Sequence, residues 1–577
     1  MALISLDVFD TAIFRKVFKP TDIFHIVEDE VGGNFHNLRI EAQNKARKVS
    51  AYYNIFDIYS YIPQFNPKEE IKAEYANCKA NPYILDMYNN SKDEFIFISD
   101  MYLPEKVIVG MLERCGYKNP RVFVSCDCKA VKSNGGLFKV VEGKIGRKIS
   151  KHIGDNYTGD IEGSKKAKIP NQEFVGLAVY NKEVITPELK DVRLRKLLID
   201  EELSNASVAE KIGYWFAPLI YSFTKKVLDE AKDNQTIFFN ARDCFLMYVV
   251  ARWILKTKKK IKYCRFSRKS CLIADIETNK PITDDANRVS LHFLRISRAN
   301  SIRDLLRMLR INTTEECTQV LRKYNITMDS NIEFHELRTV IVREALKYYQ
   351  KQLYAISSVD RSNFLKYISR LNMKNGDIFV DLGYKGTIQR SIKRISQINL
   401  KGKYLNTFDN KSFFWGVLVE KESFLPVGFL CAYTGASLEV IFSEAKGTAM
   451  AYDNTGKPIL LKDYKVRKDI TKAILRGALK GVKAIHEENI KVSMEDGLAI
   501  IKRYLDKPTI DEAEFMNQPI FENGSCDSFE SITWYDKDFI RQGKLKECYS
   551  RSYWKNAFKV LLENDPELKF LRKEIGR

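Results

Sequence analysis

Short apolar runs alternate with amphipathic stretches along the first third of the chain. Five runs rich in Val, Ile, Leu and Phe have the length expected of buried strands. They cover residues 2–9, 95–99, 121–125 and 150–154, with the last near 174–180. Between the later runs, apolar residues recur at helical spacing over 104–115, 135–147 and 160–168. Strands that alternate with helices predict βαβ units and a parallel sheet.

One long stretch interrupts this alternation. From about residue 15 to 90 the apolar residues occur at helical spacing, as in FRKVF, IFHIV and IFDIYSYI, without strong strand alternation. A helical insertion between the first two strands would sit above the carboxyl edge of the sheet, where functional residues of such folds gather.

The pattern resumes after a charged, helical bridge over 191–205. Further strands are predicted at 236–240, 262–266, 377–382, 413–419 and 426–434. Helices are predicted at 213–231, from about 244, over most of 300–370, and throughout the region after 465. The sequence therefore predicts an α/β protein with a first domain over 1–185, a second α/β domain over 195–460 and a mainly helical region over 465–577.

The length and net charge of the chain indicate how many domains and which kinds of partner to expect. A chain of 577 residues is too long for one hydrophobic core and should form about two to four domains. The formal net charge of +20 favours anionic partners such as a phosphorylated substrate, acidic lipid or nucleic acid. Because acidic residues are interspersed nearly everywhere, a solvated lysine-rich surface is the simpler interpretation. Nucleic acid ranks last as a partner, since no nucleic-acid-binding motif occurs.

Cysteine usage and hydropathy predict a cytoplasmic protein. The eleven cysteines form no CxxC pair, and only Cys126 and Cys128 are close, so we expect reduced thiols and no zinc site. A signal peptide is not expected because Asp7 interrupts the first apolar run. No run reaches the roughly 18 apolar residues of a membrane helix. The lysine-rich segment KTKKKIK (256–262) is a candidate for peripheral contact with the inner face of a membrane.

Four polar segments fall at or just past the predicted strand ends of the first domain. They are D-V-F-D-T beginning at Asp7, FIFIS ending at Ser99, KSNGGLF beginning at Lys132, and HIGDNYTGD with Asp155 and Asp160. A carboxylate at such an end can act as a nucleophile on a phosphoryl group. Oxygen ligands from Asp7, Asp155 and a main-chain carbonyl of the Asp7 turn would suit Mg²⁺. Ser99 and Lys132 would stabilise the transferring phosphoryl group.

These four segments resemble the motifs of the haloacid dehalogenase (HAD) superfamily. The resemblance implies a Rossmann-like parallel sheet with a helical cap over about 15–90, and Mg²⁺ as cofactor. It implies Asp7 as nucleophile, Ser99 as the second-motif hydroxyl and Lys132 as the third-motif lysine. The metal would be held by the carboxylates of Asp7, Asp155 and Asp160 and by the carbonyl of Phe9. His152, next to this last motif, is interpreted as a sheet-packing residue rather than an acid or base.

One position departs from the superfamily pattern. HAD phosphatases usually carry a second Asp two residues after the nucleophile as general acid and base, and Phe9 stands there. Asp10 could replace it only if the turn bends it inward. Three interpretations stay open: a phosphatase that uses Asp10 or another group, an enzyme acting on a different electrophile, and a degenerate domain that only binds a phosphorylated ligand.

A second set of polar residues follows strand ends in the second domain. The set comprises Arg242, Asp243, Ser267, Arg268, Asp381, Gly383, Gly386, Thr387 and Gln389. A strand that leads through a Gly-containing turn into a helix can bind an anion with its main-chain amides. Arg side chains suit phosphate or carboxylate recognition. The sequence contains no P-loop or GxGxxG motif.

This second set resembles a group of bacterial HAD-containing proteins found with capsule, lipopolysaccharide and other surface-glycan machinery. That group has A-R-D-G where this chain has Cys244 in place of Gly, followed by S-R and D-x-G-x-x-G-T-x-Q; residues 437–453 are similar as well. The order of strand and turn also resembles a phosphoribosyltransferase. The resemblance implies a phosphohydrolase on a phosphorylated sugar or related metabolite, working with other glycan-biosynthesis proteins. The alternative is a glycosyl- or phosphoribosyl-type transferase centred on the second domain.

Overall fold

The computed structural model describes most of the chain. The described residues are 2–17, 19–174, 189, 194, 197, 206–279, 281–282, 301–313, 317–332, 335–414, 417–429, 436–461, 465–522 and 529–575. Contacts divide the chain into two compact units, residues 1–205 and 206–577, and each is considered by itself. The predicted bridge helix over 191–205 lies outside the described residues, apart from the buried Leu194 and Leu197.

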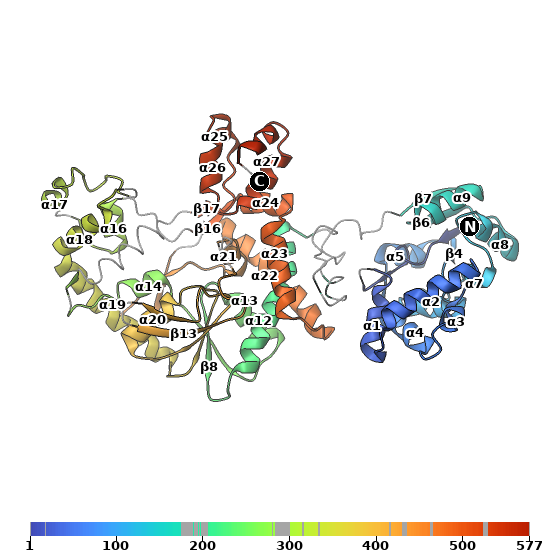
Figure 1. The fold of residues 1–577 in the computed structure, drawn as a ribbon, viewed down its shortest axis with the longest axis horizontal. Coiled ribbons are helices and arrows are strands. Elements are labelled where there is room, and N and C mark those ends of the chain that lie inside the picture. Colours follow the sequence, from blue (N-terminus) through green and yellow to red (C-terminus); the bar gives the residue numbers. More distant parts are fainter. Residues whose placement is uncertain are drawn as a thin grey trace. The chain divides into compact units, whose positions relative to one another are not determined.

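The first unit is a parallel sheet with a helical insertion (Figure 1). Its strands are β1 (Leu3–Leu6), β2 (Ile13–Arg15), β3 (Cys78–Ala80), β4 (Glu94–Ser99), β5 (Val122–Val124), β6 (Lys151–Gly154) and β7 (Asn171–Glu173). Its α-helices are α1 (Asp22–Val31), α2 (Phe35–Val49), α3 (Ile55–Tyr59), α4 (Pro67–Ala76), α5 (Pro82–Asn90), α6 (Glu105–Arg114), α7 (Ser125–Cys128), α8 (Gly136–Ile145) and α9 (Gly163–Lys166). A π-helix, η1 (Tyr157–Glu162), directly precedes α9.

The five-stranded sheet has the order β5-β4-β1-β6-β7, with every neighbouring pair parallel. Successive side chains of β4 point to opposite faces of the sheet, as in any pleated strand. Phe95 and Phe97 face the core that includes α6, whereas Ile96 and Ile98 face the core that includes α8. The chain leaves β1 towards β4 and later returns to β6 on its other side, so the carboxyl end of β1 is a topological switch point.

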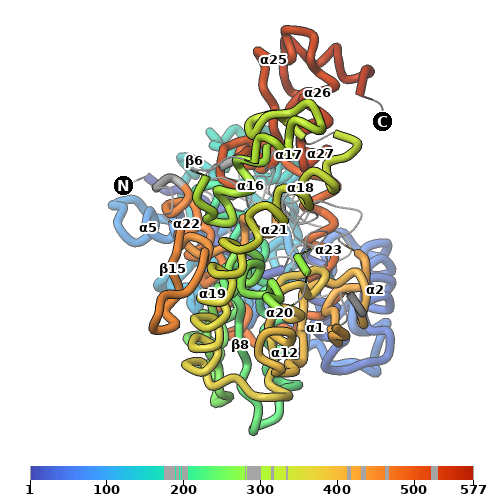
Figure 2. Tube along the Cα trace, turned by 90° about the vertical axis from the view of Figure 1, so that its left-hand side faces the viewer, coloured from blue at the N-terminus to red at the C-terminus, as the bar shows by residue number. Residues whose placement is uncertain are grey.

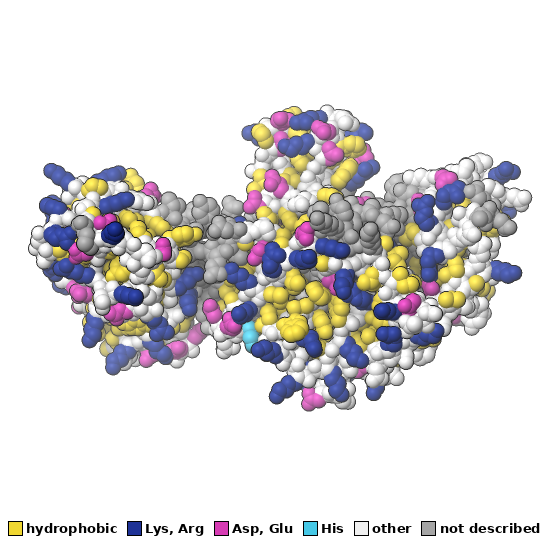
Figure 3. Space-filling view, turned by 180° about the vertical axis from the view of Figure 1, so that it is seen from behind, with side chains coloured by type: hydrophobic (Ala, Val, Ile, Leu, Met, Phe, Trp, Pro, Cys, Tyr) yellow, Lys and Arg dark blue, Asp and Glu magenta, His cyan; other side chains and the backbone are white. Residues whose placement is uncertain are grey.

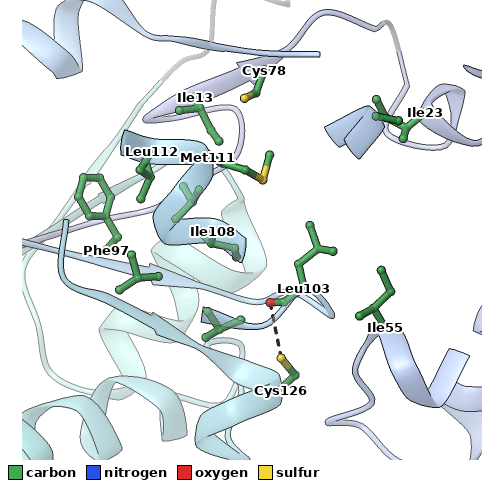
Figure 4. Close-up of a cluster of buried hydrophobic side chains, with 14 of the residues drawn as sticks. Ile13, Ile23, Ile55, Cys78, Phe97, Leu103, Ile108, Met111, Leu112 and Cys126 are labelled. Atoms are coloured by element: carbon green, nitrogen blue, oxygen red, sulfur yellow. Dashed lines mark hydrogen bonds between the residues drawn. The ribbon is translucent and has the colours of Figure 1, made fainter. Parts of the chain in front are cut away.

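The helical insertion shares its hydrophobic core with the sheet. Ile23 and Ile55 of the insertion belong to the same buried cluster as Phe97 of β4 and Met111 of α6. Figure 4 shows these side chains together, and the Leu103 carbonyl accepts a hydrogen bond from the Cys126 thiol beside them. The insertion is therefore packed onto the sheet as one body with it.

The strands and helices predicted for this unit are found, with three corrections. The insertion is not wholly helical, because β2 and β3 form an antiparallel ribbon within it. The closing strand is Asn171–Glu173, ahead of the expected run: Phe174 follows the strand, and 175–180 lie outside the described residues. The helix expected over 160–168 begins three residues earlier, at Tyr157, as the π-helix η1.

The second unit contains a six-stranded sheet, two small hairpins and many helices. Its strands are β8 (Thr236–Asn240), β9 (Lys260–Cys264), β10 (Ile378–Asp381), β11 (Lys401–Tyr404), β12 (Lys411–Phe414), β13 (Val417–Ser423), β14 (Ala449–Tyr452), β15 (Pro458–Leu460), β16 (Pro519–Glu522) and β17 (Phe529–Ser531). Its helices before residue 400 are α11 (Val208–Trp215), α12 (Ala217–Glu230), α13 (Phe245–Val249), the π-helix η4 (Val250–Ile254), α14 (Arg268–Leu272), α16 (Ile302–Met308), α17 (Thr318–Arg322), α18 (Arg338–Tyr348), α19 (Gln350–Leu371) and α20 (Thr387–Ser396). Its later helices are α21 (Ala436–Phe442), α22 (Lys465–Glu487), α23 (Met494–Asp506), α24 (Ile510–Met516), α25 (Lys537–Arg541), α26 (Leu545–Arg551), α27 (Lys555–Asn564) and the 3₁₀ helix η6 (Lys569–Ile575).

The large sheet has the order β12-β13-β11-β10-β8-β9. All its pairs are parallel except β12 with β13. Strands β8 and β10 are neighbours from which the chain departs in opposite directions along the sheet, so their carboxyl ends form a second switch point. The long helix α19 runs from the cluster α16–α18 down beside the sheet (Figures 1 and 2).

Two strand predictions in this unit are wrong, one is shifted and one strand was missed. The run 413–419 is not one strand, because β12 ends at Phe414 and pairs antiparallel with β13, which begins at Val417. The run 426–434 begins with a turn over 426–429 rather than a strand, and 430–434 lie outside the described residues. Strand β9 starts two residues before the predicted one, and β11 had no prediction because KGKY lacks an apolar run.

The C-terminal region packs against the start of the second unit. Helix α22 crosses α11 closely because glycines stand at the contact: a Cβ on Gly213 would lie 2.0 Å from the Ile474 carbonyl oxygen. A Cβ on Gly477 would lie 1.9 Å from the Glu210 carbonyl oxygen. The predicted α/β fold class, with a helical C-terminal region, is confirmed. Among the described residues, no helix has both the length and the apolarity to cross a membrane.

Candidate active site

Asp7 lies at the switch point of the first sheet, one residue after β1. Its main-chain N–H donates to the Ile153 carbonyl of β6 at 2.9 Å, which holds the residue against the neighbouring strand. The following turn closes when the N–H groups of Ala12 and Ile13 both donate to the Val8 carbonyl. The carboxylate of Asp7 is buried, at 6% exposure, and burial raises its pKa to about 8.

Lys132 places a buried ammonium between two carboxylates. Its Nζ lies 2.5 Å from Asp7 Oδ1 and 2.5 Å from Asp160 Oδ1. The main-chain N–H of Lys132 donates to both carboxylate oxygens of Asp100 at 3.0 Å, which fixes the loop that carries Lys132. Burial alone would lower the pKa of Lys132, but Asp7, Asp160 and Asp100 outweigh it and raise the pKa. The side chain therefore stays charged and donates to both carboxyl groups.

Asp160 is fixed by three donors. It accepts from Lys132, from His152 Nε2 at 2.9 Å on the same oxygen, and from the Asn156 main-chain N–H on the other oxygen. Burial opposes ionisation, but Lys132 and His152 hold the pKa of Asp160 below its usual value. His152 Nδ1 lies 2.8 Å from the Ser5 hydroxyl. Because burial lowers the pKa of His152, a neutral ring donates to Asp160 and accepts from Ser5.

Asp155 completes a group of three carboxylates. Ligand oxygens of Asp7, Asp155 and Asp160 all lie within 4.8 Å of one another. The Thr11 hydroxyl donates to Asp155 Oδ1 at 3.2 Å. Burial raises the pKa of Asp155 to about 6, helped by the negative charges of Asp10 and Asp160. Three clustered carboxylates and one lysine leave an excess of negative charge, which a divalent cation with oxygen ligands would relieve.

The three carboxylates differ in their capacity to bind a metal. Asp160 already accepts three hydrogen bonds, so it has less room for a further ligand bond than Asp7 or Asp155. We therefore assign Asp160 chiefly to orienting Lys132. Asp7 and Asp155 keep room for a metal ligand bond, and their carboxylate oxygens would suit Mg²⁺.

The Phe9 side chain fills the position expected for the general acid and packs against Arg15. Its ring lies 4.0 Å from the guanidinium carbon of Arg15, which is itself paired with buried Glu74 of α4 at 2.9 Å. Asp10 is exposed and has a left-handed backbone, with φ of 59°. Its charge acts on Asp155 and on Arg15. Phe9 thus contacts Arg15 of the insertion.

Ser99 and the segment after it connect the site to the insertion. Ser99 ends β4 and is 2% exposed. Three residues later, the Tyr102 carbonyl accepts from the Ile55 N–H, and the Tyr102 hydroxyl donates to Glu70 at 2.9 Å. Glu70 also binds fully buried Arg39. This buried network holds the helices of the insertion at a fixed position relative to the strand that ends at Ser99.

The second unit carries a separate polar group at its own switch point. Asp381 ends β10 and is buried, and its carboxylate accepts from the Leu382 N–H at 3.0 Å. Burial and the charge of Asp243 raise the pKa of Asp381, against the opposing effect of Arg268. The Tyr384 hydroxyl is buried and has no hydrogen-bond partner within the described chain. Glu439, Asp243 and Arg268 all act electrostatically on this hydroxyl.

Other residues predicted for this second site have structural roles. The Gln389 amide donates to the carbonyls of Leu400 and Glu420, and its oxygen accepts from a tyrosine, so the side chain is used inside the sheet. Ser267 caps α14 and donates to the Ala449 carbonyl at 2.5 Å.

The glycines of the predicted cradle lie against the sheet. A Cβ on Gly383 would be 2.8 Å from the Asn406 carbonyl oxygen, and one on Gly386 would be 2.8 Å from Lys421 Cδ. Thr387 begins α20, and Arg242 lies in the turn after β8. The close Asn406 carbonyl explains Gly383, and a left-handed backbone with φ of 65° explains Gly386, without an anion.

Three residues of the first site make contacts that the sequence did not predict. Asp100 directly follows the strand-end residue Ser99, which was a signal in the sequence. Its hydrogen bond to the Lys132 loop joins distant parts of the chain and could not be read from the sequence. His152 is buried and packs edge to face on Phe138, as predicted, and it also orients Asp160, which the sequence did not indicate. Thr11 is the last residue of D-V-F-D-T and binds Asp155.

Comparison with protein-family models and with curated proteins finds no match to this chain.

Proposed function

We propose that the first unit is a Mg²⁺-dependent phosphohydrolase of the HAD type that acts on a phosphorylated sugar or related metabolite. The observation that carries this proposal is the buried Asp7 at the sheet's switch point, paired with Lys132 at 2.5 Å and close to two further carboxylates. A buried nucleophile, a fixed cation and an oxygen ligand set are the parts that phosphoryl transfer needs.

Each residue has a role in the proposed reaction. A carboxylate oxygen of Asp7 attacks phosphorus, the bond from phosphorus to the leaving oxygen breaks, and an aspartyl phosphate forms. Water then attacks that phosphorus, releases inorganic phosphate and regenerates the carboxylate. Ser99 donates a hydrogen bond to a phosphoryl oxygen, and Lys132 balances the negative charge that accumulates. Mg²⁺ held by Asp7, Asp155 and the Phe9 carbonyl would supply further charge compensation.

The absence of an acid at Phe9 shapes the expected substrate range. Protonation of the leaving oxygen by a positioned acid is worth roughly 10²–10⁴-fold in rate. Substrates whose leaving group needs no proton, such as aryl or acyl phosphates, should therefore react best unless Asp10 moves inward. A different electrophile and ligand binding without turnover remain the competing interpretations of this site.

The direct test is release of inorganic phosphate from a panel of phosphorylated metabolites and p-nitrophenyl phosphate, with Mg²⁺. The native protein should release phosphate, and Asp7→Asn, which keeps the shape of the side chain, should abolish release. Activity that survives in Asp7→Asn would exclude Asp7 as the nucleophile. If no substrate is turned over, tight Mg²⁺-dependent binding of fluoroberyllate to Asp7 would still support a competent nucleophile, and no binding would favour the degenerate alternative.

A second candidate is a glycosyl- or phosphoribosyl-type transferase in the second unit. Its support is the buried Tyr384 hydroxyl at the switch point of the second sheet, near Asp381, Asp243 and Arg268. If this site performs the chemistry, Asp381→Asn should remove function in the surface-glycan pathway that the resemblance implies, whereas Asp7→Asn should not. The reverse result would assign the chemistry to the first unit.

A further inference from the structure

A basic hollow lies at the amino-terminal edge of the second sheet, opposite the edge that carries Asp381. Its volume is about 650 Å³. It is lined by the starts of β8 and β9, by the segment that joins η4 to β9, and by the segment that joins α19 to β10. The basic residues in this lining are Arg252, Lys256, Lys259, Lys260, Lys262 and Lys374.

Few acids balance these cations. Asp377 is the one acidic residue in the lining, and it is buried. Its two carboxylate oxygens accept from the main-chain N–H groups of Thr236 and Lys374, so it fixes the chain. Lys259 is paired with Asp233 at 2.6 Å. The remaining five basic side chains are exposed around the hollow.

The cluster is not just a run of lysines in sequence. Strand β9 is an edge of the sheet, and lysines on an edge strand discourage pairing with other chains. That role explains Lys260 and Lys262, but it does not call for Arg252 on η4 or Lys374 beyond α19. Three separate segments thus direct cations to the same hollow. Figure 3 shows acidic side chains interspersed among basic ones on one face of the molecule.

An exposed tryptophan lines the same hollow. Trp253 on η4 is 66% exposed, and the guanidinium carbon of Arg252 lies 5.6 Å from the centre of its ring. An indole left in water forfeits the burial of a large apolar surface. At a membrane surface, by contrast, the ring can sit among lipid head groups while its N–H stays hydrated.

We propose that this edge of the second unit docks on a bilayer rich in anionic lipids, with Trp253 at the level of the head groups and the lysines against lipid phosphates. The hollow is mostly lined by lysines, which act as mobile point charges and suit a diffuse negative surface. Recognition of one small anion would favour fixed, partly buried donors, but the cations that face the hollow are exposed. A nucleic-acid strand would need an extended basic groove with several aromatic rings, whereas the lining has one.

The test is sedimentation of the full-length protein with vesicles of phosphatidylcholine alone or of phosphatidylcholine mixed with phosphatidylglycerol. The native protein should bind the anionic vesicles, dissociate from them at high salt, and not bind the neutral vesicles. The variant Lys256→Gln/Lys260→Gln removes two exposed charges and should weaken binding roughly thirtyfold, because each lysine near such a surface contributes about a factor of five. Trp253→Ala should weaken binding with no change in charge.

The matched control is Lys502→Gln/Lys507→Gln, which removes two exposed charges at the end of α23. It should bind anionic vesicles nearly as well as the native protein. The proposal is overturned if the native protein does not bind them, or if the two double variants bind equally. It is also overturned if inorganic pyrophosphate or a single-stranded oligonucleotide binds the native protein, loses affinity only in the Lys256/Lys260 variant, and anionic vesicles do not bind.

Discussion

A single methyl group at Gly163 should disable the proposed active site without removing any polar group. A Cβ there would lie 2.1 Å from the Lys132 carbonyl oxygen, and real Cβ contacts essentially never fall below 3.0 Å. Gly163→Ala must therefore move the Lys132 loop and α9 apart by about 0.9 Å. Carried to Nζ, such a shift would lengthen the 2.5 Å contacts with Asp7 and Asp160 to about 3.4 Å, beyond hydrogen-bonding range.

The expected cost has two parts. Forcing the backbone apart should lower the free energy of unfolding by about 1–3 kcal/mol. Misplacing a catalytic cation by about 1 Å should lower kcat/KM roughly 100-fold. Gly143→Ala is the matched control, because a Cβ there has nothing within 4 Å and lies within α8. That variant should keep full activity and gain up to about 1 kcal/mol of stability.

The two variants are to be compared by phosphate release from p-nitrophenyl phosphate with Mg²⁺ and by urea unfolding. If Gly163→Ala were as stable and as active as Gly143→Ala, the close approach of α9 to the Lys132 loop would not exist in solution. Loss of stability with full activity would refute the claim that this approach positions Lys132.

Three further outcomes follow from buried charges. Lys132→Met should lower kcat/KM by roughly 10²–10³-fold while leaving phosphate release measurable, and an unchanged kcat/KM would show that this cation takes no part. Because burial raises the pKa of Asp155 to about 6 and that of Asp7 to about 8, protons compete with Mg²⁺ at both ligands. Calorimetry should therefore find affinity rising with pH through both values and levelling above about 8; a flat profile would contradict the assignment of these carboxylates as ligands. Arg503→Met leaves buried Glu512 without its partner at 2.7 Å and should lower the free energy of unfolding by about 3–5 kcal/mol, part of which Arg503→Met/Glu512→Leu should restore; urea unfolding that matches the native protein would count against the pairing.

Four strands of the first sheet, β1, β4, β5 and β6, were predictable because they are mostly buried on both faces, whereas the polar, largely exposed β7 was not. Runs such as FIFIS carry apolar residues at every position, so both the strand and its polar end at Ser99 are visible in the sequence. The second sheet contains strands without this signal. In KGKY of β11, buried Gly402 and Tyr404 alternate with two exposed or partly exposed lysines, and pairing with β10 and β13 makes the segment a strand.

The first site was more predictable than the second for a related reason. Asp7, Lys132 and Asp155 act from strand ends or adjacent loops, and the order of strands suffices to bring them together. The role of Gln389 depends on where its side chain points, and it points into the sheet towards the Leu400 carbonyl rather than to the edge. A Gly-containing turn looks the same in sequence whether an anion or a neighbouring chain segment approaches it.

The glycine contacts between α11 and α22 have a consequence for how the protein is made. Residues 1–174 close their sheet and core early, so that unit can fold while the ribosome is still translating the second. The second unit is different, because α11 at its start binds α22, which is synthesised some 250 residues later. Until Gly477 has emerged, the apolar faces of α11 and α12 lack their cover. We expect nascent chains that stop before residue 465 to bind chaperones and aggregate, and complete chains to escape both.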